Sequence, residues 1–446
     1  MTNCFCYAIM AAMKAGTARI DITPSEPVFM DGMIRNHKST GIRHRLYSKA
    51  LAFSSGNLPE DIFVIASADV CAIARADHEN ICANVARQTG ISTEHIILAA
   101  THNHSGPATV GYFNPKEEQY LKYFIKQTAE TITRAVFNMR PALMGCGAGI
   151  ENTISHYRRL LAKDGHVIMN WEPYSADQIV GPLGEIDPEV GVLKAVSTDP
   201  DHKPLAILFN HAGHPNVMSG DNYLLTADYP GRAENILEQR LGGTAVFVNG
   251  AQGTMDIDGL KDRDWQGMER VAGALAEAVM QTSAAVAVKS DSIVRGACAH
   301  YALPARQISS RELEWAKNIL AGTKGKINTL PDGVGDDYKA ALFKRLHAVQ
   351  EIPHQVEQVG IIVGDTAWLS FPGELFTEIG VRIKRASPFG HTHLIGLANG
   401  NIGYVPTRAA VRQGGYEPET RNVDEAAEEI IFEQSLALLK RLQAGR

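Results

Sequence analysis

The sequence lacks the features that would assign it to a membrane or to nucleic acid. No apolar run approaches the roughly 18 residues that a membrane-spanning helix needs. No block of basic residues stands out, and 43 basic against 49 acidic residues leave a formal charge of −6. A nucleic-acid-binding protein usually shows a basic patch or stripe. We therefore expect a globular protein with no transmembrane segment and no nucleic-acid partner.

Cysteine is also scarce. The 446 residues include six cysteines, and no two of them form a CxxC pair. Scattered cysteines in a long chain favour reduced, mostly buried thiols over a disulfide framework. The opening segment, MTNCFCYAIMAAMKAG, carries no positive residue before Lys14, whereas a secretory signal begins with a charged region. We interpret residues 1–13 as a disordered leader and expect a cytoplasmic protein, with secretion through a weak signal as the alternative.

Strand-like and helical segments alternate along the rest of the chain. The pattern predicts strands over 61–70, 95–101, 204–210, 244–250 and 393–399, a hairpin over 359–371, and helices over 76–89, 116–139, 229–241, 264–281, 374–386 and 424–442. This alternation predicts an α/β protein in which mixed β-sheets are flanked by helices. Because no internal repeat or low-complexity linker divides residues 14–446, we expect them to form one domain.

Two histidines stand one residue apart at the end of a predicted strand. In ATHNHSGPAT (99–108), His102 and His104 follow the apolar run HIILA. Residues i and i+2 of an extended chain point to the same side, so we expect both imidazoles to enter one pocket. A metal site is one interpretation of this pair. Two hydrogen-bonded polar residues in a turn are the other.

Further metal-ligand types follow other predicted strands, at the edge where open α/β sheets collect functional residues. They are His211 and His214 after 204–210, Asp256 and Asp258 after 244–250, Glu374 after the hairpin and at the start of a helix, and Tyr404 and Tyr416 after 393–399. Imidazoles, carboxylates and phenols gathered on one edge have the composition of a zinc site. Several of these residues also have a simpler interpretation. His211 fits a structural position, Glu374 fits the N-terminus of a helix, where a carboxylate is favourable, and the two tyrosines fit half-buried aromatic positions. His391 and His393 precede their strand and fit structural or exposed positions.

With these residues, the sequence resembles the neutral (non-lysosomal) ceramidase family and its shorter bacterial relatives. The resemblance runs from AGTARIDITP (15–24) to YVPTRAAVRQGGYE (404–417), and THNHSGP (101–107) is similar to the THTHSGP segment of the family. It implies the family's catalytic fold, with the metal site at the C-terminal ends of strands. It also implies a zinc ion held by four residues, which are His102, His214, Glu374 and Tyr404.

Two spacings of the family recur here. His214 precedes Leu224 by ten residues, as the second zinc histidine of the family precedes its LIS motif, which selects His214 over His211. Tyr404 and Tyr416 are twelve residues apart, like the ligand tyrosine and the substrate-contacting tyrosine of the family. The resemblance implies that His104, Tyr416 and Arg158 contact the substrate. Arg159 competes with Arg158 for that position.

The sequence departs from the family pattern in two places. Asp256 in GTMDID (253–258) stands where the family has a serine important for activity, and the chain ends without the family's immunoglobulin-like domain. Asp256 suits a general base, a polar clamp on the substrate, or a ligand to a second metal. We expect the loops 29–46 and 322–339 to shape the pocket.

These observations predict a zinc-dependent hydrolase that acts on an amide, or an ester, of a small molecule other than ceramide. A metal-bound hydroxide also attacks other electrophiles, so a hydrolase of glycosidic or phosphate ester bonds stays open. A homologue that binds zinc and a ligand without turnover is the third possibility.

Overall fold

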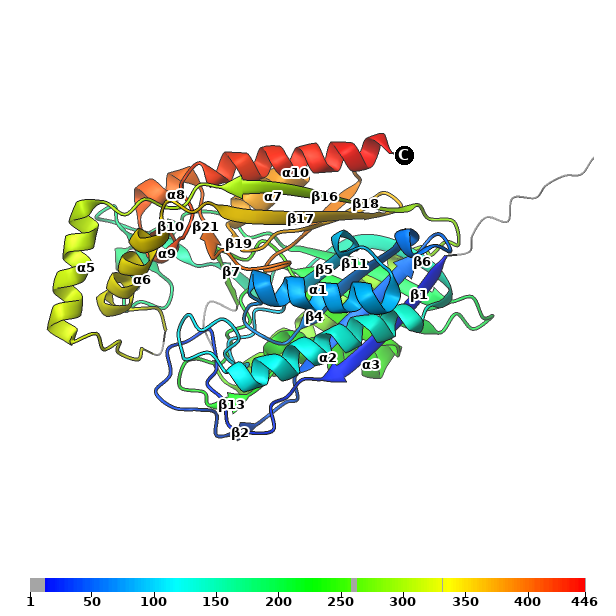
Figure 1. Ribbon diagram of the computed structural model, residues 1–446, viewed down its shortest axis with the longest axis horizontal. Helices are drawn as coiled ribbons and strands as arrows, with labels where there is room; N and C mark the ends of the chain where they lie inside the picture. The colour runs from blue at the N-terminus through cyan, green and yellow to red at the C-terminus, as the bar shows by residue number, and fades with distance from the viewer. Residues whose placement is uncertain (1–12, 258–262, 331, 446) are drawn as a thin grey trace, which may run out of the picture.

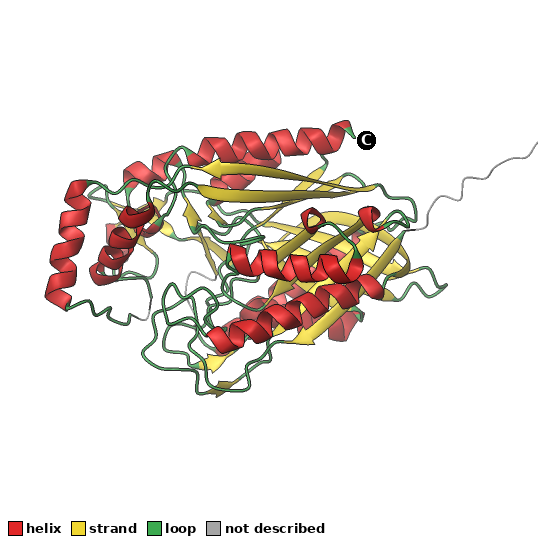
Figure 2. Ribbon diagram, in the orientation of Figure 1, coloured by secondary structure: helices red, strands yellow, loops and turns green. Residues whose placement is uncertain are grey.

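The computed structural model describes residues 13–257, 263–330 and 332–445. Two β-sheets face each other, and helices cover the outer face of each sheet, which gives four layers (Figures 1 and 2). The prediction of mixed sheets flanked by helices is confirmed. Residues 1–12 of the predicted leader, with Cys4 and Cys6, and the candidate ligand Asp258 lie outside the described residues.

The larger sheet has eight strands in the order β14-β12-β11-β6-β1-β3-β4-β5. In chain order they are β1 (Lys14–Asp21), β3 (Tyr47–Ser54), β4 (Ile62–Ala68), β5 (Ile96–Ala100), β6 (Arg140–Ile150), β11 (Glu189–Ser197), β12 (Pro204–His211) and β14 (Thr244–Asn249). The pairs β4–β5 and β12–β14 are parallel and the other pairs are antiparallel. The alternation of side chains along β3 sends Ala50 and Ala52 toward the covering helices, and Leu51 and Phe53 toward the second sheet.

The second sheet has four strands, β16 (Val294–Leu303), β17 (His354–Val363), β18 (Thr366–Ser370) and β20 (His391–Ile395). β17 and β18 form the predicted hairpin, and its turn falls at Gly364-Asp365. Trp368 of β18 is fully buried in the core between the two sheets. The other face of this sheet packs against α7 (Thr377–Ala386) and α10 (Ala427–Ala444), which Figure 1 shows along the upper edge of the molecule.

Four helices cover the larger sheet: α1 (Arg75–Thr89), α2 (Glu118–Phe137), α3 (Asp228–Leu241) and α4 (Trp265–Ala285). A separate pair, α5 (Ser310–Thr323) and α6 (Asp336–Val349), packs around its own small core at one end of the molecule (Figure 1). The short helices are α8 (Arg408–Gln413) and α9 (Tyr416–Thr420), and the single-turn helices are η1 (Pro59–Asp61), η2 (Thr93–His95) and η3 (Ala176–Gln178).

The remaining strands are short and lie in the connections. They are β2 (Gly41–Ile42) paired with β13 (Leu224–Leu225), β7 (Ser155–Tyr157) paired with β15 (Met255–Ile257), β19 (Glu374–Leu375) paired with β21 (Tyr404–Val405), and the group β8 (Arg159–Ala162), β9 (Val167–Met169) and β10 (Ile179–Pro182). These pairs fix the loops at the edge where the larger strands end.

Two predicted elements that bear on the site have wrong boundaries. The helix predicted over 374–386 begins only at Thr377, because the amide of Glu374 donates to Gly403 O (3.0 Å) and pairs this segment with β21. The strand predicted over 393–399 ends at Ile395, since Leu397 and Asn399 adopt positive φ angles of 50° and 63°. The same strand begins at His391, earlier than predicted. His391 and His393 thus lie inside β20 rather than before it, and His393 is buried.

Within the described ranges, no helix is both long and apolar enough to cross a bilayer. The four cysteines that the structure describes are all free. Cys71 and Cys82 are buried, and Cys146 and Cys298 are half-buried.

Candidate active site

His102 and His104 meet in a turn that directly follows β5. Their Nε2 atoms are 3.2 Å apart, although the extended geometry expected for this segment does not persist. His102 has a φ of 70°, so a left-handed turn, and not strand alternation, brings the rings together. The turn is fixed because the amide of His102 donates to Val70 O (3.2 Å) and the amide of His104 donates to Pro215 O (3.1 Å).

His214 follows β12 and joins these two rings. The His214 ring centroid is 4.8 Å from that of His102 and 5.8 Å from that of His104. Its Nδ1 lies 2.9 Å from Met255 O, and His102 Nδ1 lies 2.9 Å from Cys71 O. A carbonyl oxygen only accepts hydrogen bonds, so both Nδ1 atoms donate. In a neutral ring, this fixes the tautomer and leaves the Nε2 lone pair facing the site. Burial alone would lower the pKa of His102, but Glu374 raises it well above its usual range.

Glu374 and Tyr404 complete this group. Glu374 Oε2 lies 3.2 Å from His102 Nε2 and 3.1 Å from His214 Nε2, and Tyr404 Oη lies 3.4 Å from His214 Nε2. Burial alone would raise the pKa of Glu374, but His102 and His214 oppose it and hold that pKa well below its usual range. Glu374 is therefore an ionised carboxylate between two imidazoles. Burial raises the pKa of the Tyr404 phenol.

The spacing of these donors fits a zinc ion. The ligand atoms of His102, His214 and Glu374 all lie within 4.8 Å of one another, and all three residues are buried. Zinc bonds of about 2.0–2.1 Å in a tetrahedral shell put neighbouring ligand atoms about 3.3 Å apart. The distances of 3.1 and 3.2 Å from Glu374 Oε2 to the two imidazoles are close to that value. The nitrogen and oxygen donors are also the types that zinc accepts.

Two other groups of potential metal ligands occur among the described residues. Cys71 and His104 form one with His102, which therefore overlaps the first group. Glu94, Cys298 and His300 form another, in which the side chains of Glu94 and His300 are about half exposed. Neither group combines burial with ionised carboxylate and imidazole donors, as the group around Glu374 does.

Arg158 contacts His214 at Nε2, the same ring nitrogen that faces Glu374. One guanidinium nitrogen is 3.1 Å from His214 Nε2, and Arg158 Nε donates to Glu417 Oε1 (2.6 Å). Arg159 donates to the second oxygen of Glu417 (3.0 Å) and has no such contact with His214. The structure thus brings Arg158 to the imidazoles and places Arg159 one layer further out. All three side chains are buried.

Asp256 lies next to Arg158. It lies in β15, its Oδ1 accepts a hydrogen bond from Asn216 Nδ2 (3.1 Å), and the same oxygen is 4.0 Å from an Arg158 nitrogen. Neither Asp256 nor Arg158 is among the residues that line the cavity in front of the imidazoles. His211, the competitor of His214, is hydrogen-bonded to Ser155 Oγ (3.0 Å) and takes no part in the group.

A small cavity of about 70 Å³ opens in front of the imidazoles. Predicted site residues that line it are His102, His104, Glu374, Tyr404 and Tyr416. The predicted loop 29–46 contributes Asp31 and Gly32, and the predicted loop 322–339 contributes Tyr338, which lies in α6.

Several other lining residues were not indicated by the sequence. They are Tyr112, Phe113, Leu342 and Arg345, and Asp31 was expected only as part of the loop 29–46. Phe113 stacks on Tyr338 with ring centroids 5.4 Å apart, so α6 closes one side of the cavity. The sequence around these residues shows only an Asp-Gly pair, which is typical of a turn, and a Gly-Tyr-Phe segment. Neither pattern indicates which distant loop the residues contact.

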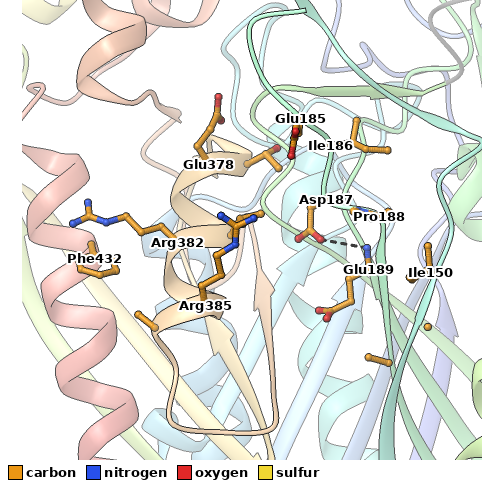
Figure 3. A pocket seen from close by; sticks show the side chains of 15 residues that line it. Ile150, Glu185, Ile186, Asp187, Pro188, Glu189, Glu378, Arg382, Arg385 and Phe432 are labelled. Atoms are coloured by element: carbon orange, nitrogen blue, oxygen red, sulfur yellow. Dashed lines mark hydrogen bonds between the residues drawn. The ribbon is translucent and has the colours of Figure 1, made fainter.

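A larger hollow of about 940 Å³ lies elsewhere, between the segment 185–189 and α7 (Figure 3). None of the eight predicted site residues lines it. Three of the charged residues that line it have ion-pair partners: Arg382 contacts Glu429, and Asp187 and Glu189 both contact Lys384. The buried group of potential metal ligands therefore lies at the small cavity and not at the larger hollow.

The model of the neutral/alkaline non-lysosomal ceramidases, N-terminal part, matches residues 13–284, more than half of the chain. The chain belongs to this family. The neutral ceramidase of Pseudomonas aeruginosa is 24% identical over 257 residues, which are 54% of this chain and 36% of that protein. The chain therefore matches only about a third of the length of this curated relative.

Solved ceramidase structures share the fold. The crystal structure of neutral ceramidase from Pseudomonas aeruginosa superposes with a TM-score of 0.72 at 19% identity, covering 97% of this chain and 75% of that one. The structure of a ceramidase complexed with C2 gives a TM-score of 0.75 at 18% identity, covering 97% and 76%. Within this ceramidase fold, the chain gathers all eight predicted residues at one end of the larger sheet. Six are potential ligands or cavity-facing groups, and Arg158 and Asp256 lie next to them without lining the cavity.

Proposed function

We propose that this member of the ceramidase family is a zinc-dependent hydrolase that cleaves an amide, or an ester, of a small molecule. The observation that carries the proposal is the buried group of His102, His214 and Glu374, whose ligand atoms all lie within 4.8 Å of one another. The Nδ1 contacts to Cys71 O and Met255 O support it, because they orient both imidazoles as metal-ligating histidines are usually oriented. Tyr404 is the proposed fourth ligand.

Zinc, when bound, acidifies a water and polarises the carbonyl under attack. His104 and Tyr416 face the cavity and are the proposed donors to the oxyanion. Burial, with the nearby His102 and His214, holds the pKa of His104 well below its usual range. Burial raises the pKa of Tyr416, so its phenol keeps the proton that it donates. Losing one such donor typically costs on the order of 3 kcal/mol of transition-state stabilisation.

Arg158 and Asp256 are assigned to positioning rather than to substrate contact, because neither lines the cavity. Arg158 is held by Glu417 and contacts the site-facing Nε2 of His214, so it helps to orient that ring. Asp256 holds Asn216 and lies 4.0 Å from the same guanidinium.

A substrate smaller than ceramide is supported by the dimensions and lining of the cavity. Its volume of about 70 Å³ is far below the roughly 300–1,000 Å³ of sites for drug-sized ligands. Charged side chains from Asp31 and Arg345 also line it. A long alkyl chain gains nothing from such groups, whereas a small polar molecule does.

The test combines metal analysis with an activity screen of the full chain. We expect about one zinc per chain that is lost in His102→Ala and kept in His347→Ala, an exposed histidine outside the site. Chelation abolishes, and zinc restores, hydrolysis within a panel of N-acyl amides, N-acyl amino acids, lactones, glycosides and phosphate esters. A metal-free protein with unchanged activity contradicts the proposal. Zinc binding without turnover identifies a binding protein, and turnover of glycosides or phosphate esters alone identifies a different bond.

A further inference from the structure

Asp31 is a buried carboxylate in the cavity wall for which the proposed chemistry has no use. Its side chain is inaccessible to solvent and lines the cavity in front of the imidazoles. The next residue, Gly32, has a φ of 88° and packs so tightly on the His104 ring that an added Cβ would lie 2.4 Å from His104 Cγ. Asp31 is thus held next to the group proposed to act on the scissile bond.

Most hydrogen-bonding groups of Asp31 are already used by the protein. Its amide donates to Gly106 O (3.1 Å), its carbonyl accepts from Arg35 (3.2 Å), and its Oδ2 accepts from the amide of Val110 (3.2 Å). The Oδ1 atom has no hydrogen-bond partner anywhere in the described part of the chain. The position of the side chain is fixed, and one of its oxygens is left for something else.

The neighbouring cation does not pair with this carboxylate. Arg35 directs its three hydrogen bonds to the carbonyl oxygens of Asp31, His104 and Asn222. This arrangement locks the Asp31 turn onto the His104 turn and leaves the Asp31 carboxylate without a bound guanidinium.

Leaving a buried polar atom without a partner costs about 1–3 kcal/mol, and more for a charged group. Burial raises the pKa of Asp31 to about 6, against the backbone amides of Val110, Thr109 and Gly111, which lower it. The carboxyl group is therefore ionised at neutral pH, where it only accepts hydrogen bonds. In the wall of this cavity, such an oxygen is available to accept a hydrogen bond from a bound molecule.

We propose that Asp31 recognises the substrate, its Oδ1 accepting a hydrogen bond from a hydroxyl, N–H or ammonium group that lies close to the scissile bond. This inference rests on the proposed hydrolase function and adds the substrate class. The substrate is a small amide or ester that carries a hydrogen-bond donor at this position. A plain alkyl group leaves Oδ1 unpaired, and a carboxylate there is repelled.

The test compares substrates that differ only in a hydroxyl or a methyl group. N-acetylethanolamine against N-acetylpropylamine places the difference on the amine side. N-glycoloylpropylamine against N-propanoylpropylamine places it on the acyl side. We expect the zinc-loaded protein to prefer the hydroxyl member of at least one pair by about tenfold or more in kcat/KM, since a site built to hydrogen-bond a group rejects analogues that lack it.

Variants separate recognition from structure. Asp31→Ala reduces the preference to less than about twofold, whereas Asp31→Asn, which keeps an acceptor, retains part of it. Leu342→Met, an apolar change in the same cavity wall, alters both members of a pair equally. Thermal unfolding of each variant checks that it folds.

Three outcomes bear on the inference. An equal preference in wild type and Asp31→Ala, or no preference in wild type, overturns it. If zinc binds and nothing is turned over, the proposed hydrolysis fails, and the preference is then read from Kd by calorimetry. Loss of that Kd preference in Asp31→Ala supports recognition by Asp31, and its persistence overturns the inference.

Discussion

Glu374 and Tyr404 are directly paired residues of the two-stranded parallel ladder β19–β21. The amide of Glu374 donates to Gly403 O, and the amide of Phe376 donates to Val405 O, so the backbone joins two segments that are distant in the sequence. As a result, a carboxylate and a phenol reach the same imidazole, at 3.1 and 3.4 Å from His214 Nε2. A strand pair, and not the start of a helix, positions these two groups.

Glu374→Gln is expected to lower zinc affinity more than Tyr404→Phe. The first variant removes the negative charge between the two imidazoles, and the second removes a neutral phenol at the edge of the group. Changing an outer-shell partner typically costs about 10–100-fold in metal affinity, so losing the central carboxylate should cost at least about 100-fold and losing the phenol about tenfold. Competition with a fluorescent zinc chelator measures both affinities. Equal affinities in wild type and Glu374→Gln contradict the assigned ligand set.

Local periodicity predicted half of the larger sheet, the strands β4, β5, β12 and β14, and the hairpin of β17 and β18. It did not indicate the remaining strands of that sheet, β1, β3, β6 and β11, or the strand β16 and the helices α5 and α6. His102 and His104 were expected to converge through strand alternation, whereas in the structure a left-handed turn at His102 brings them together. The left-handed conformation of His102 is imposed by hydrogen bonds to Val70 and to other loops, which no local pattern indicates.

The residues around the imidazoles and the wall of the cavity were less predictable. Arg158 was expected to contact a substrate, and Asp256 to act as a general base, a polar clamp or a ligand to a second metal, but neither lines the cavity. Whether a residue near the imidazoles lines the cavity depends on loops packed from far along the chain. Asp31 illustrates the difficulty, since its partners Gly106 and Val110 lie in another segment. An aspartate before a glycine has the ordinary pattern of a turn.

Glu417→Gln is expected to destabilise the protein by about 3 kcal/mol. Glu417 is fully buried and holds Arg158 and Arg159 through its two oxygens, so the variant leaves two buried guanidinium groups without their carboxylate. Breaking a buried ion pair typically costs about 3–5 kcal/mol. Urea unfolding gives the free energy, with Glu429→Gln as the control. Glu429 pairs with Arg382 at the surface, where such pairs contribute about 0–1 kcal/mol. Equal losses in the two variants contradict the assignment of Glu417 as a buried anchor.

Asp31→Asn is expected to stabilise the protein above pH 6 and to leave it unchanged near pH 4. An aspartate in an unfolded chain titrates near pH 3.9, whereas burial raises the pKa of Asp31 to about 6 in the folded state. Between these two pH values Asp31 is deprotonated in the unfolded chain but still protonated in the folded protein. The contribution of Asp31 to the free energy of unfolding therefore falls as pH rises, by about 3 kcal/mol in total. The variant does not titrate. Urea unfolding at pH 4, 5.5 and 7.5, with a chelator present, measures the difference. A gap that is independent of pH rules out a buried ionised Asp31.

Gly32→Ala is expected to impair activity far more than its effect on backbone strain explains. Gly32 and Gly165 have nearly equal positive φ angles, 88° and 92°. An alanine Cβ at 32 meets the His104 ring at 2.4 Å, whereas at 165 nothing lies within 4 Å. Both substitutions therefore carry the same cost of roughly 1 kcal/mol for a non-glycine residue at positive φ. Only Gly32→Ala displaces the His104 ring. We expect Gly165→Ala to keep wild-type kcat/KM and Gly32→Ala to lose about 100-fold or more, the scale of losing one oxyanion donor. If both variants keep full activity, the close packing of Gly32 on His104 does not position a group that acts on the substrate, and the role of His104 as a donor fails with it.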